Sequence, residues 1–430
     1  MDYFLFLICL ALPTYLIRFQ IFGIPTNLLE ICLYLGVLGQ VVIIFKKRSF
    51  NFKPITSSNI LTPTVLILLS GVISVFISPD KRTSLGILKG WFVDPILLTG
   101  LILLNIQSEK TAQKIIWGLT GSGTLVAFWG IMQKFGFGYL LPHQSLDPSF
   151  RSYLITGRSF GPFESPNYLG MYLAPVSLLL FFYWLKTKLI SSPKILFQKK
   201  QLNTREVFFK WQIKDFLILF CFLVMLLALF FTQSLGAWLG FGIAMLLGIF
   251  LFFRPLLPLN PKSKLIFDIA YLICALLLIL GSFVLIKNMG CRVENSFAAR
   301  QEVWQVAWYL VRKYPLTGIG LGLFPLFYHQ TVARLHFPPL NWFQLHPHNL
   351  FFAFWLNLGL LGLLAFLWLL LVAFRQIIKN QQLFLLAPLL AIVIHGLVDT
   401  TYWKNDLSVI FWIFLALAFL YRQNEKENSV

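Results

Sequence analysis

Long apolar windows separated by short polar segments run along nearly the whole chain. Windows of about 20 apolar residues match a helix that crosses a bilayer. They predict about twelve spans, near residues 3–19, 24–44, 59–77, 85–105, 112–133, 167–185, 215–232, 235–253, 266–286, 348–374, 382–399 and 407–421. Only the letters TQSLG separate two of these windows around residues 232–235, so we expect a tight helical hairpin there. The pattern predicts an all-α polytopic membrane protein that forms a single domain over residues 1–430.

Composition supports the same class. The chain is 58% hydrophobic and 12% charged, with a mean hydropathy of +0.77, whereas soluble domains carry about 25% charged residues. So much apolar surface could not be buried in one soluble core, so the solvent around the helices must be lipid. The first window has no basic start and no small-residue cleavage site, so we expect it to be a retained span rather than a removed signal peptide.

The charge pattern predicts the orientation of the spans. With the N-terminus in the cytoplasm, about 21 of the 35 lysines and arginines fall in cytoplasmic loops or the C-terminal tail, as the positive-inside rule requires. Both termini then face the cytoplasm, a basic loop at about 186–214 lies inside, and two long segments at about 134–166 and 287–347 lie outside. The net charge of +19 therefore indicates contact with membrane lipid rather than with nucleic acid. The five cysteines show no metal-ligand or disulfide spacing.

The second outer segment contains a candidate amphipathic helix between residues 295 and 315. Apolar residues recur at helical spacing, Asn295 or Ser296 can cap its start, and Pro315 stops it. Its first turn holds Arg300, where a cation opposes the helix dipole, so we interpret this arginine as intended for an anionic partner. We expect the helix to lie near the outer membrane surface. The GIGLG stretch at 318–322 follows no predicted strand, which favours a re-entrant or tightly packed turn over a phosphate loop.

Two histidines and an asparagine stand directly before the apolar window at 348–374, in the stretch HPHNLFFAFWLNLGLLG. Asn349 or His348 could simply cap the helix, and His346 could have the same structural role. The functional alternative is that His348 acts as a base at the outer interface, because an imidazole titrates near neutral pH, and that His346 and Asn349 contact the substrate.

Four stretches in this order carry a resemblance: GRSFGPFESPNYLGMYL (157–173), TQSLGAWLG (232–240), RQEVWQVAWYLVRKYPLTGIGLGLF (300–324) and HPHNLFFAFWLNLGLLGLL (346–364), with HGLVD (395–399) after them. Together they resemble the O-antigen ligase and O-antigen polymerase superfamily of membrane glycosyltransferases, over about residues 20–420. The resemblance implies a GT-C-like helical fold in the bacterial inner membrane. It also implies transfer of a glycan from an undecaprenyl diphosphate carrier to an acceptor hydroxyl on the outer face, without a metal or another cofactor.

The resemblance also implies roles for particular residues. His348 would be the base that acts on the acceptor hydroxyl, and Arg300 would hold the diphosphate. Many members of the superfamily carry a second arginine where this chain has Leu235, so a replacement is needed for full activity. Arg158 and Arg151 in the other outer segment are available by topology, although both could be solvated loop residues. Asn167 either turns the chain into its span or contacts the donor.

Elementary chemistry is consistent with these roles. A leaving diphosphate gains charge that fixed cations must meet, and arginine binds two phosphate oxygens at once. Direct displacement at the anomeric carbon would invert its configuration, and we find no paired carboxylates of the glycosidase kind in the outer loops. Lys89, inside a predicted span, pairs with Asp94 or with a donor phosphate. His395 and Asp399, four residues apart, could pair with each other.

Three functions stay open at this stage. The first is the glycosyltransferase, as a ligase or as a polymerase, with a glycan, lipid or protein acceptor. The second is a transporter of a small anion, which should show broken helices and polar residues near the bilayer midplane. The third is a non-catalytic family member, which the leucine at position 235 keeps open.

Overall fold

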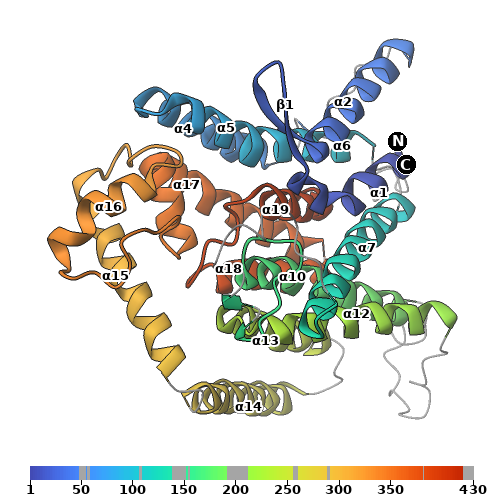
Figure 1. Cartoon of the computed structure of the whole chain (residues 1–430). Coiled ribbons are helices and arrows are strands. Elements are labelled where there is room, and N and C mark those ends of the chain that lie inside the picture. The colour runs from blue at the N-terminus through green and yellow to red at the C-terminus, as the bar shows by residue number, and fades with distance from the viewer. Residues whose placement is uncertain are drawn as a thin grey trace. The chain divides into compact units, whose positions relative to one another are not determined.

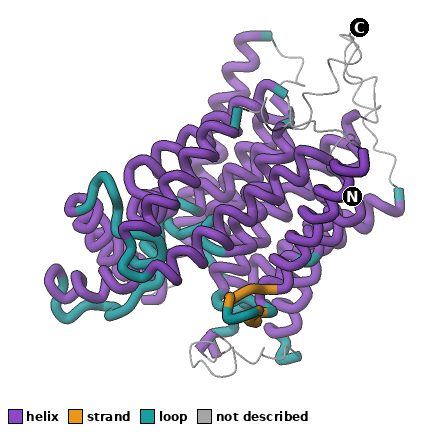
Figure 2. Tube along the Cα trace, turned by 90° about the horizontal axis from the view of Figure 1, so that it is seen from above, coloured by secondary structure: helices purple, strands orange, loops and turns teal. Residues whose placement is uncertain are grey.

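The computed structural model describes residues 1–47, 55, 59–105, 109–137, 152–153, 155–190, 212–254, 260–287, 291–380 and 382–419. Within these residues the elements are helices apart from one two-stranded hairpin (Figure 2), as the predicted all-α class requires. The chain divides into two compact units. The first comprises Met1–Ser122, Asn295–Gln381 and His395–Val430, and the second comprises Gly123–Glu294 and Gln382–Ile394.

The first unit contains most of the labelled elements in Figure 1. Its N-terminal part consists of α1 (Asp2–Leu10), a 3-10 helix (Leu12–Leu16), β1 (Arg18–Ile21), β2 (Ile24–Asn27), α2 (Leu28–Lys47) and α4 (Leu61–Ile77). Then follow α5 (Lys81–Leu88), a π-helical turn (Lys89–Val93), α6 (Asp94–Asn105) and α7 (Glu109–Lys134), which continues into the second unit. Its later elements are α15 (Cys291–Lys313), α16 (Phe324–Leu335), α17 (Leu350–Lys379) and α19 (Asn405–Phe419).

An aromatic cluster holds the start of α17 against the turn that precedes α19. The rings of Phe354 and Phe366 stack with centroids 3.8 Å apart, and Trp403 and Tyr402 pack against Phe354 at 5.2 and 5.1 Å. Phe92 from the π-helical turn completes the cluster, and all five side chains are buried. Large buried aromatic rings dominate core energetics, so this packing fixes the backbone on both sides of the site described below.

Helix α17 is broken at Gly359, where the backbone leaves the helical region with φ 70° and ψ −175°. The loop after α15 fits into the break. Leu360 donates its N–H to the Leu316 carbonyl at 3.1 Å, and Ile319 donates to the Leu356 carbonyl at 2.7 Å. The GIGLG stretch is therefore a tightly packed turn, as predicted, and backbone groups at the break are hydrogen-bonded by protein.

The predicted amphipathic helix is present as α15, with two corrections. It begins at Cys291 rather than at a cap on Asn295 or Ser296, and it ends at Lys313, before Pro315. Its apolar face packs against protein: Val303, Val306, Ala307, Leu310 and Val311 form one buried cluster with residues of α16, α17 and the turn at 318–322.

Residues 3–19, predicted to be one span, do not form one continuous helix. The nine-residue helix α1 ends at Leu10, and the chain continues into the 3-10 helix with Pro13 in its first turn and then into the β1–β2 hairpin. The hairpin turns at Phe22 and Gly23, which both have positive φ, as tight two-residue hairpin turns require. The apolar pattern alone could not distinguish these short elements from one long helix.

The second unit is built around α10 (Pro166–Ile190), which packs against α12 (Ile213–Thr232), α13 (Leu235–Phe253) and a 3-10 turn (Leu383–Leu385). It also contains α14 (Pro261–Lys287) and α18 (Leu386–His395). Two residues connect α12 to α13, and Gln233 adopts the left-handed conformation there. The predicted tight hairpin is confirmed.

Seven helices of the described residues are long and apolar enough to cross a membrane: Leu28–Lys46, Lys81–Asn105, Glu109–Lys134, Pro166–Lys188, Ile213–Thr232, Leu235–Phe253 and Leu350–Lys379. Three shorter apolar helices cover Leu61–Ile77, Leu383–His395 and Asn405–Phe419. Several of these helices expose large apolar side chains, for example Phe216 and Phe220 on α12, which is expected where lipid is the solvent. The expected total of about twelve spans stays a prediction.

Candidate functional site

The site lies in the first unit, where the loop before α17 meets the turn after α18. Asn349 is the N-cap of α17, and its side-chain oxygen accepts hydrogen bonds from the backbone N–H groups of Phe351 and Phe352, both at 2.9 Å. Its amide nitrogen donates to the Leu397 carbonyl at 2.9 Å. Of the two capping candidates, Asn349 therefore caps the helix, and the side chain of His348 is left for another role.

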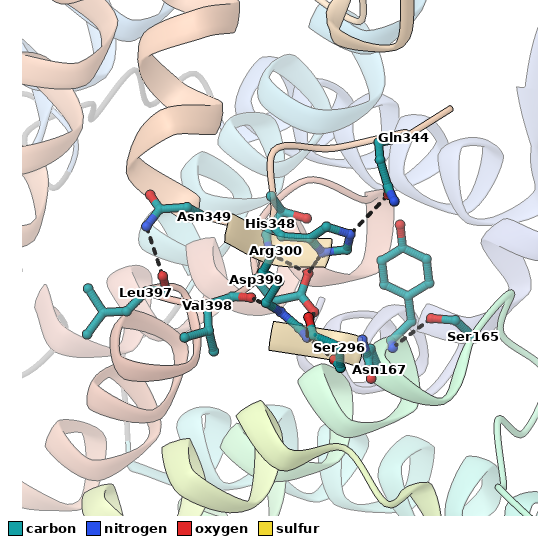
Figure 3. A network of polar contacts seen from close by, with 12 residues as sticks. Ser165, Asn167, Ser296, Arg300, Gln344, His348, Asn349, Leu397, Val398 and Asp399 are labelled. Atoms are coloured by element: carbon teal, nitrogen blue, oxygen red, sulfur yellow. Dashed lines mark hydrogen bonds and ion pairs between the residues drawn. The ribbon is translucent and has the colours of Figure 1, made fainter. Parts of the chain in front are cut away.

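The imidazole of His348 contacts a carboxylate that comes from a distant part of the sequence. Nδ1 of His348 lies 3.0 Å from Oδ1 of Asp399, and the other carboxylate oxygen lies 3.7 Å from the guanidinium of Arg300 (Figure 3). The carboxylate is 3% exposed, while His348 and Arg300 retain 28% and 20% of their side-chain exposure. The two residues predicted to be catalytic, His348 and Arg300, thus lie beside the same buried carboxylate.

The charge of this acid is held by its neighbours. Burial opposes ionisation of Asp399, but the adjacent His348 and Arg300 outweigh it and hold the pKa of the carboxyl below its usual range. The backbone N–H of Thr400 adds a hydrogen bond of 2.9 Å to Oδ1. An ionised Asp399 is an acceptor only, so Nδ1 of His348 carries the proton that it donates, and in the neutral imidazole Nε2 bears the lone pair.

Gln344 covers that second nitrogen. Its side-chain oxygen is placed 3.3 Å from Nε2 of His348, and rotating the amide by 180° would present an N–H donor to the same lone pair. The positive φ of His348, 45°, and the hydrogen bond from the Trp304 indole N–H to the His348 carbonyl, 3.0 Å, orient the histidine backbone. Nε2 of His348 is therefore held in place and faces the flexible side chain of Gln344.

Arg300 is fixed by several partners. Its Nε donates to the Val398 carbonyl at 3.0 Å, and one terminal nitrogen donates to the carbonyl and hydroxyl of Ser296, one turn earlier in α15. The second terminal nitrogen faces Asp399. Arg300 thus meets an anionic group within the protein itself, but it lies in the middle of α15 and not in its first turn, so the argument from the helix dipole is wrong.

Other predicted residues of the first unit lie in different surroundings. The ring of His346 lies beside that of Trp91, with centroids 6.4 Å apart, and burial together with the neighbouring His348 lowers the pKa of His346 to about 4. Lys89 pairs with Glu30 at 2.8 Å and donates to the Pro25 carbonyl at 3.0 Å. The predicted pairing of Lys89 with Asp94 is wrong, because Lys89 pairs with Glu30 and the Asp94 carboxylate accepts a hydrogen bond from the Tyr34 hydroxyl.

In the second unit, Arg158 and Asn167 contact each other. The guanidinium of Arg158 donates to the side-chain oxygen of Asn167 at 3.3 Å and to the Thr232 carbonyl at 3.0 Å. Thr232 is the last residue of α12, and Leu235, after the two-residue turn, is the first residue of α13. Arg158 therefore sits beside the turn at which the superfamily carries its second arginine, and Arg151 lies outside the described residues.

Sequence reasoning missed the hydrogen-bond partners of His348. Asp399 was expected to pair with His395 on one helical face, but α18 ends at His395 and the carboxylate turns toward His348 and Arg300. Gln344 was not singled out at all. The sequence offered Asp399 only as the last residue of the HGLVD stretch, which does not specify a partner 51 residues away in the sequence.

Comparison with known protein families gives a match to part of the chain. Residues 220–367 match the family model described as O-antigen ligase, which confirms the resemblance to the O-antigen ligase and polymerase superfamily. The matched segment includes Arg300 and His348 and ends before Asp399. No curated protein matches the chain.

Proposed function

We propose, starting from the match to the O-antigen ligase family, that this protein transfers a glycan from an undecaprenyl diphosphate carrier to an acceptor hydroxyl during cell-envelope polysaccharide synthesis. The observation that carries the proposal is the contact of His348 and Arg300 with the two oxygens of Asp399. It supplies an oriented base and a fixed cation in one partly exposed place. We further propose an inner-membrane location, with both termini cytoplasmic and the site on the outer face.

The base step follows from the tautomer. Because Nδ1–H of His348 is bonded to Asp399, Nε2 takes the proton of the acceptor hydroxyl once Gln344 yields its place. The acceptor oxygen bonds to the anomeric carbon as the bond to the diphosphate breaks, and this displacement inverts the anomeric configuration. The buried carboxylate stabilises the imidazolium that forms, as in other dyads of this kind.

The leaving diphosphate needs cations. Arg300 offers a planar guanidinium. Its nitrogen lies 3.7 Å from the Asp399 carboxylate, which is longer than a hydrogen bond. We propose that it also binds the diphosphate, and that Arg158, Arg151, Asn167 and Lys89 are the candidates for further donor contacts. In this reading Arg158 replaces the arginine that is absent at position 235, and the reaction requires no metal.

Substitution of the two central residues tests the proposal. In full-length protein, His348→Ala should reduce glycan transfer by about 10²- to 10⁴-fold, the usual contribution of a positioned base, and Arg300→Ala should also abolish most transfer. The matched control is Arg312→Ala, which removes an exposed arginine of the same helix α15 and should retain activity. Transfer that survives both site substitutions in well-folded protein would rule out the enzyme.

The broken helix α17 keeps the transporter as a second candidate, because broken helices are typical of transporters. In transporters of that kind, the ends of the half-helices bind the substrate. Here the loop at 315–322 hydrogen-bonds the N–H of Leu360 and the carbonyl of Leu356 at the break, which favours the glycosyltransferase. Uptake of bicarbonate into liposomes containing the protein would support the transporter instead.

A further inference from the structure

A cavity of about 670 Å³ opens on the first unit between the turn before α5, the start of α16 and the loop before α17. Its volume is within the range of small-molecule binding sites. No step described above uses it. The lining residues that matter here are Asp80, Gly322, Leu326, His329, Trp342 and Phe343.

The lining combines flat apolar surfaces with groups that bind hydroxyls. Trp342 and Phe343 are 50% and 60% exposed, which leaves aromatic surface available to a ligand. The Asp80 carboxylate caps α5 through the Thr83 N–H, at 3.0 Å, and these hydrogen bonds lower the pKa of Asp80, so it accepts only. Nδ1 of His329 faces the Trp342 carbonyl at 3.0 Å and must donate to it, so in the neutral imidazole Nε2 is an acceptor.

A buried carboxylate hydrogen-bonds the backbone of the loop that carries the two aromatic rings. Glu302, 5% exposed, accepts hydrogen bonds from Leu340 N–H at 2.8 Å, Asn341 N–H at 3.3 Å and the Tyr328 hydroxyl at 2.8 Å. Hydrogen bonds to a charged group are stronger than neutral ones. Trp342 directly follows this clamp, so the aromatic surface is preorganised, which reduces the ordering cost of binding.

The same loop connects the cavity to the base. Phe343 lines the cavity, and the next residue, Gln344, contacts Nε2 of His348 at 3.3 Å. A ligand that extends from the cavity along this loop and displaces Gln344 would present a hydroxyl to that nitrogen. We propose that the cavity binds a pyranose ring of the acceptor, which stacks on Trp342 and donates hydroxyl hydrogens to Asp80 and His329.

This inference rests on the proposed function for the identity of the ligand as the acceptor. A pyranose ring has one apolar C–H face and a rim of hydroxyls, which matches aromatic rings beside two acceptors. A lipid tail would displace water from the exposed Asp80 carboxylate and offer it no hydrogen-bond donor in return, which is costly, and an anion would be repelled by it. The chemistry of the lining therefore favours a neutral sugar.

Binding of simple glycosides tests the site without requiring catalysis. Full-length protein in a detergent without a sugar headgroup is mixed with methyl glycosides of glucose, galactose, mannose, rhamnose and N-acetylglucosamine. Saturation-transfer NMR should detect at least one of them. The signal should be lost in Trp342→Ala and reduced in Asp80→Asn, and it should remain in the control Leu345→Ala, an exposed apolar residue of the same loop that does not line the cavity.

The outcomes separate this proposal from the function. His348→Ala should bind the glycoside as the unchanged protein does, so binding survives even if the protein transfers no glycan. In an active preparation, Trp342→Ala should raise KM for the acceptor and leave KM for the lipid-linked donor unchanged. The proposal is overturned if no glycoside gives a signal, if Trp342→Ala leaves the signal intact, or if only the acyl protons of an added lysophospholipid give a signal that depends on Trp342.

Discussion

His348 owes its position to its neighbour. Because Asn349 supplies the cap of α17, the preceding residue stands outside the helix, in a left-handed conformation that turns its ring toward Asp399. An asparagine cap alone is a common structural feature. Because the Asn349 side chain accepts hydrogen bonds from the first N–H groups of α17, the imidazole of His348 lies at the start of the helix without having to cap it.

The carboxylate of Asp399 should matter for the tautomer of His348 more than for holding the loop. In Asp399→Asn, the amide can donate to Nδ1 as well as accept from it, so the base is no longer held with its lone pair on Nε2. We expect kcat to fall about 10²-fold or more, with a changed pH profile of kcat. The control is Asp268→Asn, which breaks an exposed pair with Arg254. Unchanged kcat and an unchanged profile would contradict the role.

The lowered pKa of Asp399 also sets the sign of a stability effect. A depressed pKa contributes stability that is present above the unfolded value, near 3.9, and is lost as pH falls through the folded value. Asp399→Asn should therefore lower the melting temperature at pH 7, and the difference from the unchanged protein should shrink at acid pH. This comparison accompanies the kinetic measurement on the same variant.

At the residue scale, sequence reasoning identified His348 and Arg300 but not the acid between them. Asn349, His348 and Arg300 stand in recognisable local patterns, a cap site and the first part of a helical repeat. Gln344 contacts His348 from within the same loop, and Asp399 contacts it only because the fold brings loops from different parts of the chain together. No local pattern specifies such a meeting.

Among the elements, α17 shows how an apolar window conceals a break. The sequence predicts one span at 348–374, because glycine is common in membrane helices. The structure interrupts it at Gly359, and a Cβ at this position would lie 2.3 Å from the Leu316 carbonyl oxygen. The turn at 318–322 was predicted to be tightly packed from its glycines, but its docking into α17 was not predictable from local sequence.

Gly359→Ala should therefore disrupt the packing of this loop against α17. The backbone conformation is open essentially to glycine alone, and such strain costs about 1–3 kcal/mol before the clash is counted. We expect a clearly lower melting temperature in detergent. The matched control is Gly242→Ala on α13, where a Cβ would meet nothing within 4 Å, and which should be neutral or slightly stabilising. Equal melting temperatures for the two variants would contradict the close approach.

For the molecule as a whole, periodicity and composition predicted the class better than they predicted individual spans. Helices with apolar surfaces turned outward, such as α12, follow directly from the long apolar windows. The N-terminal window gave a short helix and a 3-10 helix instead of one long helix, because Pro13 interrupts it, and the β1–β2 hairpin follows. Hydropathy indicates whether a segment is apolar enough to lie in lipid or in a protein core. It does not indicate where a helix ends.

The lysine-rich loops predict which ends of these helices face the cytoplasm, since positive residues are retained on that side. In a variant without native cysteines, Leu345→Cys lies in the loop before α17, on the predicted outer face, and Lys262→Cys lies at the start of α14, on the predicted inner face. Both positions are exposed. A membrane-impermeant maleimide added to intact spheroplasts should label the first and reach the second only after lysis. The reverse pattern would place His348 on the cytoplasmic side, where an acceptor on the outer face could not reach it.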